Sequence, residues 1–269
     1  MILFPNCKIN LGLHILHKRE DGFHDLETVF YPLPLRDALE VVTTEEMIFS
    51  QSGIEIPGDP ADNLCARAYQ LLKADFPQLP AVHIHLHKQI PTGAGLGGGS
   101  ADGAFTLKLL NTKYNLEIPD QKLEQYAAHL GSDCPFFIRN TACLAGGRGE
   151  IMEPLELDLS GYSFLVVHPG IHVNTGWAFS QLTPGQPDIP LREINWQDVL
   201  SWKETLTNDF ENVVFAAYPA IGGIKEKMYK SGAIYAAMSG SGSAVVGIYP
   251  KNEIPVLSWK EGFRAFDIP

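Results

Sequence analysis

The chain has only four cysteines in 269 residues, Cys7, Cys65, Cys134 and Cys143, and no two stand in the C-x-x-C spacing of zinc ribbons and redox pairs. It also lacks an apolar run long enough to cross a bilayer, and no basic leader with an apolar core opens it. These absences exclude a metal ribbon and a thioredoxin-type motif. They predict reduced thiols, a cytoplasmic location and no membrane partner.

Basic residues are scarce as well, with 20 Lys and Arg against 31 Asp and Glu, which gives a formal net charge of −11. Nucleic-acid affinity rests mainly on cations that neutralise phosphates, so no nucleic-acid partner is expected. A small phosphate ester remains possible, because backbone amides and one or two cations can be focused locally in a cleft. The hydrophobic fraction of 45% predicts a folded chain with a substantial core.

Several segments carry a clear periodicity. Apolar residues alternate over 9–15 and place Lys8, Asn10 and His14 on the opposite face, which predicts a half-buried strand. Residues 82–88 alternate in the same way, whereas 61–73 and 120–130 have helical spacing, the latter ending at Gly131. The pattern changes after residue 150, so we expect a domain boundary there.

A glycine-rich segment follows the strand over 82–88 and precedes a helical pattern. Five glycines within seven residues cannot form a helix interior, and at a helix start they let backbone N–H groups turn onto an anion. A simple turn without a ligand needs only one or two glycines. The predicted phosphate-binding residues are Pro91, Gly93, Ala94, Gly95, Leu96, Gly97, Gly98, Gly99 and Ser100.

Residues 93–98 also fit G-x-G-x-x-G, so a dinucleotide-binding oxidoreductase is a rival interpretation. That fold needs a second strand ending in an acidic residue about twenty positions on, whereas residues 114–120 contain a strand-breaking proline and lead into a helix. The chain has no Gly-Lys pair, which excludes a Walker loop, and it lacks the His-Arg-Asp and Asp-Phe-Gly sequences of protein kinases.

Three separated segments together resemble the GHMP kinases: 91–100 is similar to the family's phosphate loop, 8–13 to its N-terminal strand and 239–243 to its C-terminal glycine motif. Segments 21–30, 131–137, 168–170 and 208–211 resemble members that phosphorylate a cytidine-diphosphate-linked polyol in isoprenoid precursor synthesis. The chain departs from that pattern at Asn6-Cys7, where Pro-Ala is usual, at Phe23, where Tyr is common, and at Ala101, Gly103 and Ser243.

This resemblance implies an α/β (α+β) fold of two domains, with an ATP-binding GHMP kinase N-terminal domain in 1–150, a substrate-binding C-terminal domain in 151–269, and an active-site cleft between them. It implies ATP-dependent phosphorylation of a small-molecule hydroxyl. Another acceptor used within the family remains open. A nucleotide- or RNA-binding module without turnover is a second class, which the net charge and the pairing of Lys8 with Asp133 disfavour.

The resemblance also assigns roles to residues. Asp133 is the expected catalytic base with Lys8 beside it; on sequence alone Asp133 also fits a helix N-cap and Lys8 a solvated strand lysine. Asn63 and Leu64 are expected near adenine, although they also suit a helix start. Asn10, Phe23, His24 and Phe179 are expected at the acceptor, with two aromatic faces enclosing a pyrimidine; core packing is the alternative for Phe179.

Mg²⁺ is expected with ATP, because this cation prefers phosphate oxygens and water, and Ser100 is placed to assist it. No protein metal site is predicted. His83, His85 and His87 share one strand face and could chelate zinc, but any alternating strand produces such a row readily. The oligomeric state remains open.

Overall fold

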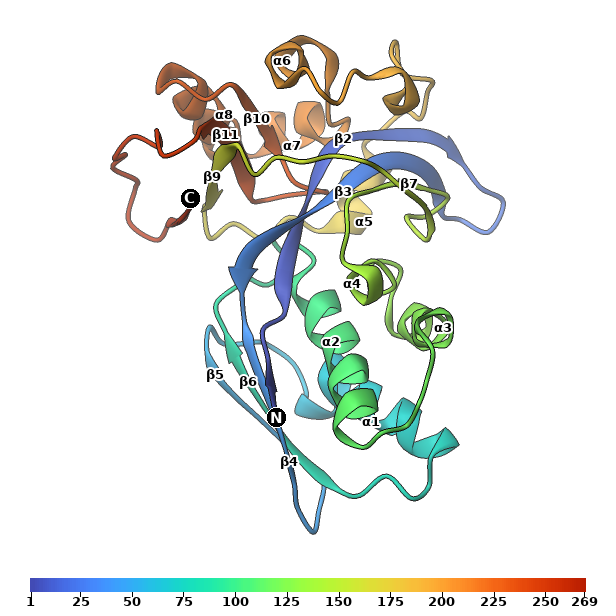
Figure 1. Cartoon of the computed structure of the whole chain (residues 1–269). Coiled ribbons are helices and arrows are strands. Elements are labelled where there is room, and N and C mark those ends of the chain that lie inside the picture. Colours follow the sequence, from blue (N-terminus) through green and yellow to red (C-terminus); the bar gives the residue numbers. More distant parts are fainter. The chain divides into compact units, whose positions relative to one another are not determined.

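The computed structural model describes residues 1–269, which divide into two compact units (Figure 1). The first unit comprises 1–8, 34–92 and 97–141; the second comprises 9–33, 93–96 and 142–269. Because the units interleave along the chain, they are not separated by one cut at residue 150. The assignment of ATP and acceptor to separate domains stays a prediction. No helix is long and apolar enough to span a membrane.

The first unit is built on a sheet of order β1-β4-β6-β5, in which only the β5–β6 pair is parallel. Its helices pack on one another, and Figure 1 shows α1 and α2 on one side of the sheet. The strands are β1 (Ile2–Leu3), β4 (Ala38–Thr43), β5 (Ile48–Gly53) and β6 (Val82–Lys88). The helices are α1 (Leu64–Asp75), α2 (Gly98–Lys113), α3 (Asp120–Leu130) and α4 (Phe136–Arg139).

The second unit contains an antiparallel sheet of order β10-β11-β9-β12, with α8 packed on β10 and β11. A further sheet has the order β2-β3-β7-β8. The strands are β2 (Asn6–Lys18), β3 (His24–Arg36), β7 (Cys143–Gly146), β8 (Ile151–Pro154), β9 (Tyr162–His168), β10 (Tyr235–Met238), β11 (Val245–Pro250) and β12 (Arg264–Ile268). The helices are α5 (Thr175–Ser180), α6 (Trp202–Thr205), α7 (Phe210–Ala217) and α8 (Pro219–Lys230).

The first long strand differs from its prediction. β2 is buried on both faces from Asn6 to Ile15, not on one. Lys8, Asn10 and His14, expected on an exposed face, are each 5% exposed or less. Alternation therefore located the strand but not its burial, because a polar face can be buried when it has polar partners.

The predicted helices are present. α3 has the predicted bounds, and Gly131 follows it as the C-cap in an extended conformation, φ 172°. α1 begins at Leu64 rather than at 61, because residues Pro60–Asp62 form a separate 3₁₀ turn and the Asn63 side chain accepts the amide of Cys65 at 2.9 Å. α2 is buried on nearly all sides between Ala101 and Leu110, so the core fixes the helix start that follows the glycine loop.

A buried ionic network joins the two elements that flank the glycine loop. The ammonium of Lys88, at the end of β6, contacts carboxylates of Asp37 and of Asp102 in α2. Asp37 also accepts the amides of Gln89 and Ile90 at 2.6 and 2.9 Å. Burial raises the pKa of Asp102 to about 8, so the pair shares one lysine unequally.

We expect Lys88→Met to lower the free energy of unfolding by about 3–5 kcal/mol, because two buried carboxylates would lose their shared cation. Asp102→Asn should destabilise less than Asp37→Asn, because the Asp37 carboxylate also accepts two backbone amides and burial already raises the pKa of Asp102. Urea unfolding of the three variants measures this. Equal losses for the two Asn variants would contradict the unequal sharing.

Candidate functional site

The glycine loop connects β6 to α2, and its backbone N–H groups lack hydrogen-bond acceptors in the protein. Gly93, Gly95 and Gly97 have φ between +63° and +79°, and Gly97 is the N-cap of α2. None of the backbone amides from Gly93 to Ser100 donates a hydrogen bond within the protein. Buried or partly buried amides normally find acceptors, so this run of donors together with the positive helix end is suited to bind an anion.

Two carbonyl groups of the same loop accept hydrogen bonds from the segment 239–244. The amide of Ala244 donates to the Ala94 carbonyl at 3.0 Å, and the Ser239 hydroxyl donates to the Gly95 carbonyl at 2.8 Å. A Cβ on Gly95 would lie 1.9 Å from the carbonyl oxygen of Ser239, so this approach requires glycine. Because the carbonyls are tied to the 239–244 segment, the loop exposes its donors and not its acceptors.

The segment 239–243 was singled out only by its resemblance to a family motif. In the structure it holds the glycine loop through hydrogen bonds. Ser239 also accepts the Asn10 amide at 3.2 Å, and the Asn10 side chain donates to Thr28 at 2.9 Å. Asn208 donates to the carbonyls of Met238 and Gly240 at 2.8 and 2.9 Å. Asn10 thus has a positioning role in the structure, and its contact with an acceptor stays a prediction.

Lys8 and Asp133 lie together in the first unit. The Lys8 ammonium is 3.4 Å from the Asp133 carboxylate, with 5% of the lysine side chain and 33% of the aspartate exposed. Lys8 is therefore not a solvated strand lysine. The side chain of Asp133 does not cap α4 either, because the N-cap residue is Pro135. The result is a buried cation beside a carboxylate that solvent and substrate can reach.

Lys8 also contacts the end of the glycine loop. A Cβ on Gly97 would lie 3.0 Å from Lys8 Cγ and from the ring of Phe137. Ser100, in the first turn of α2, lies near the thiol of Cys134, the residue that follows Asp133, and lowers the pKa of that thiol against the larger effect of burial. The cation, the carboxylate and the start of α2 therefore form one cluster within the first unit.

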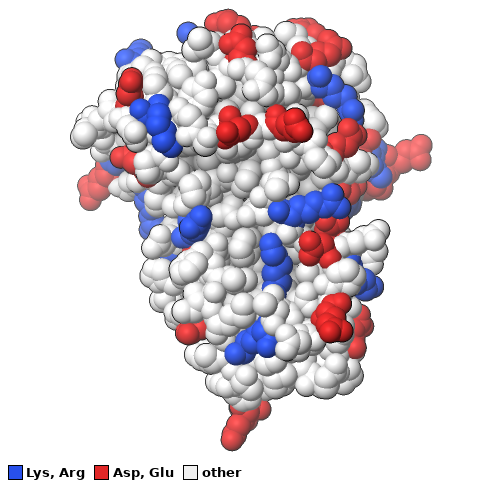
Figure 2. All heavy atoms as spheres, viewed as in Figure 1, with Lys and Arg blue, Asp and Glu red and all other residues white.

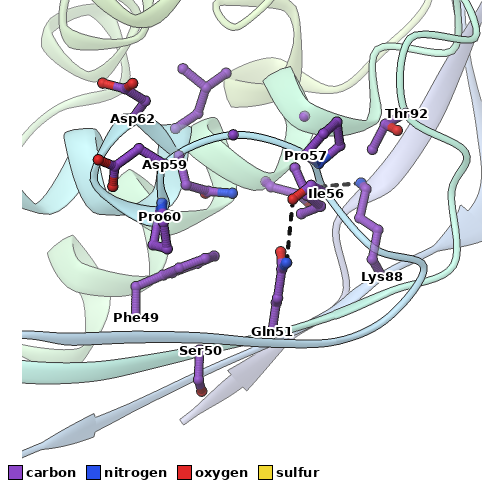
Figure 3. A pocket seen from close by; sticks show the side chains of 15 residues that line it. Phe49, Ser50, Gln51, Ile56, Pro57, Asp59, Pro60, Asp62, Lys88 and Thr92 are labelled. Carbon is purple, nitrogen blue, oxygen red and sulfur yellow. Dashed lines mark hydrogen bonds and ion pairs between the residues drawn. The ribbon is translucent and has the colours of Figure 1, made fainter.

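A pocket of about 280 Å³ opens in the same unit (Figure 3). Asn63 and Leu64, which were expected near adenine, are among the residues that line it, and their contact with adenine stays a prediction. Phe49 and Gln51 of β5 line it too, and Figure 3 shows the Ser50 side chain pointing away from them. Gly99 and Thr92, which flank the loop, complete one end together with Lys88 and Asp102. Asn63 thus both caps α1 and lines the pocket.

The predicted pyrimidine sandwich is not open in this structure. The His24 and Phe179 rings stack directly, with centroids 4.8 Å apart and 19° between their planes, so no base fits between them. Phe179 also meets the buried Phe210 edge-on at 5.0 Å. Burial and the nearby Lys18 lower the pKa of His24, which keeps its imidazole neutral at physiological pH.

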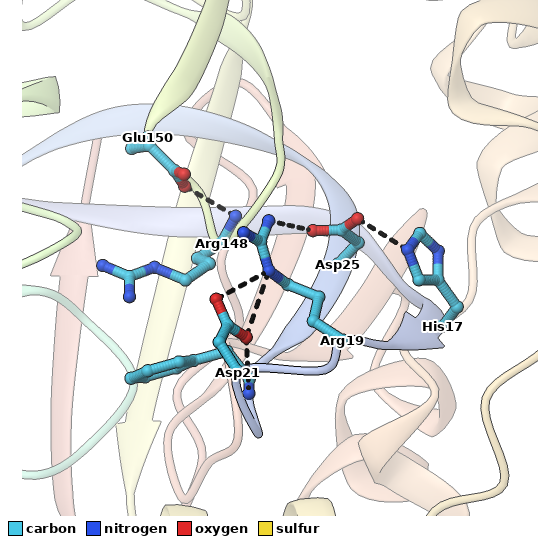
Figure 4. A network of polar contacts seen from close by, with 7 residues as sticks. His17, Arg19, Asp21, Asp25, Arg148 and Glu150 are labelled. Carbon is cyan, nitrogen blue, oxygen red and sulfur yellow. Dashed lines mark hydrogen bonds and ion pairs between the residues drawn. The ribbon is translucent and has the colours of Figure 1, made fainter.

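Phe23 lies at the turn between β2 and β3 and is 53% exposed. The guanidinium of Arg148 covers its ring at 4.3 Å. Figure 4 shows the polar network of this turn, in which Arg19 bonds both Asp21 and Asp25 and the amide of Arg148 donates to Glu150. Phe23 makes no ring contact with Phe179, so their joint role at the acceptor stays a prediction.

Sequence reasoning missed two sets of polar residues. The ion pair of Asp37 with Lys88 was not predicted, because two partners far apart in sequence produce no periodic pattern. The His83, His85 and His87 row was recognised, but its partners were not: Ser50 bridges His83 and His85 at 2.7 and 2.8 Å, and Ser52 bridges His85 and His87 at 3.0 and 2.9 Å. These serines occupy ring nitrogens that zinc would need.

Comparison with known proteins gives a consistent result over the whole chain. Residues 63–141 match the model of the GHMP kinases N terminal domain, and 191–256 match that of the GHMP kinases C terminal. A 4-diphosphocytidyl-2-C-methyl-D-erythritol kinase of Bacteroides fragilis is 53% identical over 98% of this chain and 97% of its own length. One of Cytophaga hutchinsonii is 52% identical over 93% and 92%.

A solved structure is similar as well. The crystal structure of a 4-(cytidine 5'-diphospho)-2C-methyl-D-erythritol kinase superposes with a TM-score of 0.79 at 33% identity, covering 92% of this chain and 90% of that one. The mixed helices and sheets described above are thus the fold of that enzyme, which confirms the predicted fold class.

Gly97→Ala should lower ATP affinity and kcat together, with kcat/KM falling about a hundredfold, because the new methyl would displace Lys8 and strain a residue at φ +69°. Gly223→Ala is the control, because this glycine lies in α8, outside the loop and the pocket, and no heavy atom lies within 4 Å of its added Cβ. Calorimetry with a non-hydrolysable ATP analogue and steady-state kinetics measure both. If the two variants behave alike, the packing of Gly97 on Lys8 does not matter.

Proposed function

Because the chain belongs to the GHMP kinases, a family of ATP-dependent small-molecule kinases, we propose that it transfers the γ-phosphoryl group of ATP to 4-diphosphocytidyl-2-C-methyl-D-erythritol. The product is the 2-phosphate, an intermediate of non-mevalonate isoprenoid precursor synthesis. The observation that carries the proposal is identity of about half the residues, over nearly the full length, to relatives with that name. The pairing of Lys8 with Asp133 and the unbonded amides of the glycine loop support the proposal.

Phosphoryl transfer needs little covalent help, so a kinase chiefly orients donor and acceptor, stabilises charge and removes one proton. In our proposal the Asp133 carboxylate accepts the proton of the attacking hydroxyl. Lys8, 3.4 Å away and buried, stabilises the developing alkoxide and the transferred group electrostatically. The 33% exposure of the Asp133 side chain leaves room for the hydroxyl to approach.

The nucleotide is assigned to two neighbouring parts of the first unit. The pocket beside Asn63 and Leu64 would take adenine, since apolar and amide groups share its wall. The amides of the glycine loop would take the phosphates, because they have no acceptor in the protein. Mg²⁺ would be held mainly by phosphate oxygens, with the Ser100 hydroxyl in reach at the start of α2, and would neutralise charge on the phosphates.

The acceptor's cytosine is assigned to His24 and Phe179, with Phe23 nearby in sequence. A neutral imidazole has one donor and one acceptor nitrogen, which suits the mixed donor and acceptor edge of cytosine. Phe179 offers an aromatic ring that is held in place by a perpendicular contact with Phe210. Stacking supplies affinity without choosing a base, so the choice is left to hydrogen bonds.

Other classes of function find less support. The phosphate loop alone would suit another small-molecule kinase of the family, and only the acceptor distinguishes them. Figure 2 shows basic and acidic side chains interspersed on one face, and with a net charge of −11 we propose no nucleic-acid partner. We propose cytoplasmic action, where the four buried cysteines would remain thiols.

Asp133→Asn should fold, bind ATP and lose at least about a hundredfold in kcat, the usual scale for removing a general base. Lys8→Met should lose kcat to a similar extent, because its charge acts mainly in the transition state. Coupled ADP release, with ATP binding measured separately, tests both variants. A near wild-type kcat for Asp133→Asn would remove this carboxylate from the mechanism.

The substrate assignment is tested with the cytidine compound and its uridine analogue, following the phosphorylated product by ³¹P NMR. The uridine compound should show a kcat/KM about ten- to a hundredfold lower, because a carbonyl would replace the amine that His24 reads. His24→Ala should narrow the gap, and Phe179→Ala should weaken both substrates alike. Equal kcat/KM values in the unmutated enzyme would contradict the cytidine assignment and leave the kinase assignment standing.

A further inference from the structure

His172 lies against the glycine loop and has no role in the reaction described so far. It stands in the loop between β9 and α5, and its side chain is exposed. A Cβ on Gly93 would lie 3.2 Å from His172 Nδ1 and 3.6 Å from Cε1. Both residues belong to the second unit. The absence of a side chain at residue 93 therefore leaves room for this imidazole at the first glycine of the loop.

The backbone around His172 is fixed on both sides, although the ring is exposed. The Ser243 hydroxyl donates to the carbonyl of Ile171, and Val173 is buried in the core of the second unit. The Asn174 side chain accepts the amide of Trp177 at 2.8 Å as the N-cap of α5. Thr175 and Ser241 are joined through their hydroxyls at 2.9 Å. The backbone that carries the imidazole is therefore held on both sides of residue 172, close to Gly93.

The imidazole of His172 and the backbone amides of the loop both lack hydrogen-bond partners within the protein. His172 forms no hydrogen bond, ion pair or ring contact within the protein. The amides of Gly93–Leu96 donate to no protein acceptor, while the carbonyls of Ala94 and Gly95 are already bonded. Neighbouring amides without an acceptor can bind a phosphate oxygen, and the loop itself contains no cationic side chain.

We propose that His172 donates a hydrogen bond to a phosphate group bound at the Gly93 end of the loop, as a substrate-binding residue of the kinase. The proposal rests on the function given above. A phosphate can come from ATP or from the diphosphate of the acceptor, and both present the same oxygens. Lys8 serves the Gly97 end of the loop, so His172 supplies the side-chain donor that the Gly93 end otherwise lacks.

The test compares His172→Ala, His172→Gln and the unmutated enzyme. His172→Ala should weaken one phosphate-bearing substrate about tenfold, and His172→Gln should recover part of the loss because its amide also donates. Calorimetry with a non-hydrolysable ATP analogue, ADP and adenosine, together with KM for both substrates, identifies the source of the phosphate. A loss for the analogue but not for adenosine assigns ATP, whereas a raised KM for the acceptor alone assigns its diphosphate.

Replacement of His129, an exposed histidine on α3, by Ala controls for loss of any surface imidazole. Unchanged binding of both substrates in His172→Ala, or an equal loss for adenosine and the ATP analogue, would overturn the proposal. Enzyme that binds ATP in a His172-dependent way yet rejects the cytidine acceptor would refute the proposed substrate and support His172. Unmutated enzyme that binds no nucleotide and no acceptor would refute both.

Discussion

The hydroxyl of Ser239 is the contact on which the phosphate loop depends. It donates to the Gly95 carbonyl at 2.8 Å and accepts the Asn10 amide at 3.2 Å, so it joins three segments that are far apart in sequence. Holding the loop by its carbonyls is what leaves its amides without acceptors. Under the proposed function, the backbone donors of the loop are thereby ordered before any phosphate arrives, so the ordering of the loop is part of folding and not of binding.

The need to hold the glycine loop through Asn10 also explains why β2 buries a polar face. Lys8, Asn10 and His14 lie on one side of this strand and are nearly inaccessible, which would be unfavourable without partners. Asp133 pairs with Lys8, Thr28 and Ser239 with Asn10, and Asp209 with His14 at 3.3 Å. One strand can therefore carry a buried cation and a support for the glycine loop, because buried partners fix each side chain in a single orientation.

Periodicity, capping and glycine content predicted much of the local structure. They did not predict which residues far apart in sequence would pair. The strand over 82–88 and the helix over 120–130 were found with correct bounds because period and capping are local signals. The glycine loop before α2 was located from its glycines, and its phosphate binding stays a prediction. The ion pairs of Lys88, the Ser50 and Ser52 bridges between histidines, and the place of His172 over Gly93 depend on which segments fold together, and composition carries no record of that.

The closed stack of His24 on Phe179 bears on how a base would enter. An aromatic pair contributes about 0.5–1.5 kcal/mol beyond burial, whereas stacking of a nucleobase on an aromatic side chain contributes about 1–3 kcal/mol. A nucleobase that stacks on Phe179 would therefore offset the loss of the His24–Phe179 stack. Phe179 also packs at right angles to the ring of buried Phe210, while His24 is the first residue of β3 beside a turn. Under the proposed function, His24 is thus the partner that moves, leaving the face of Phe179 for cytosine and placing its imidazole at the edge of the base.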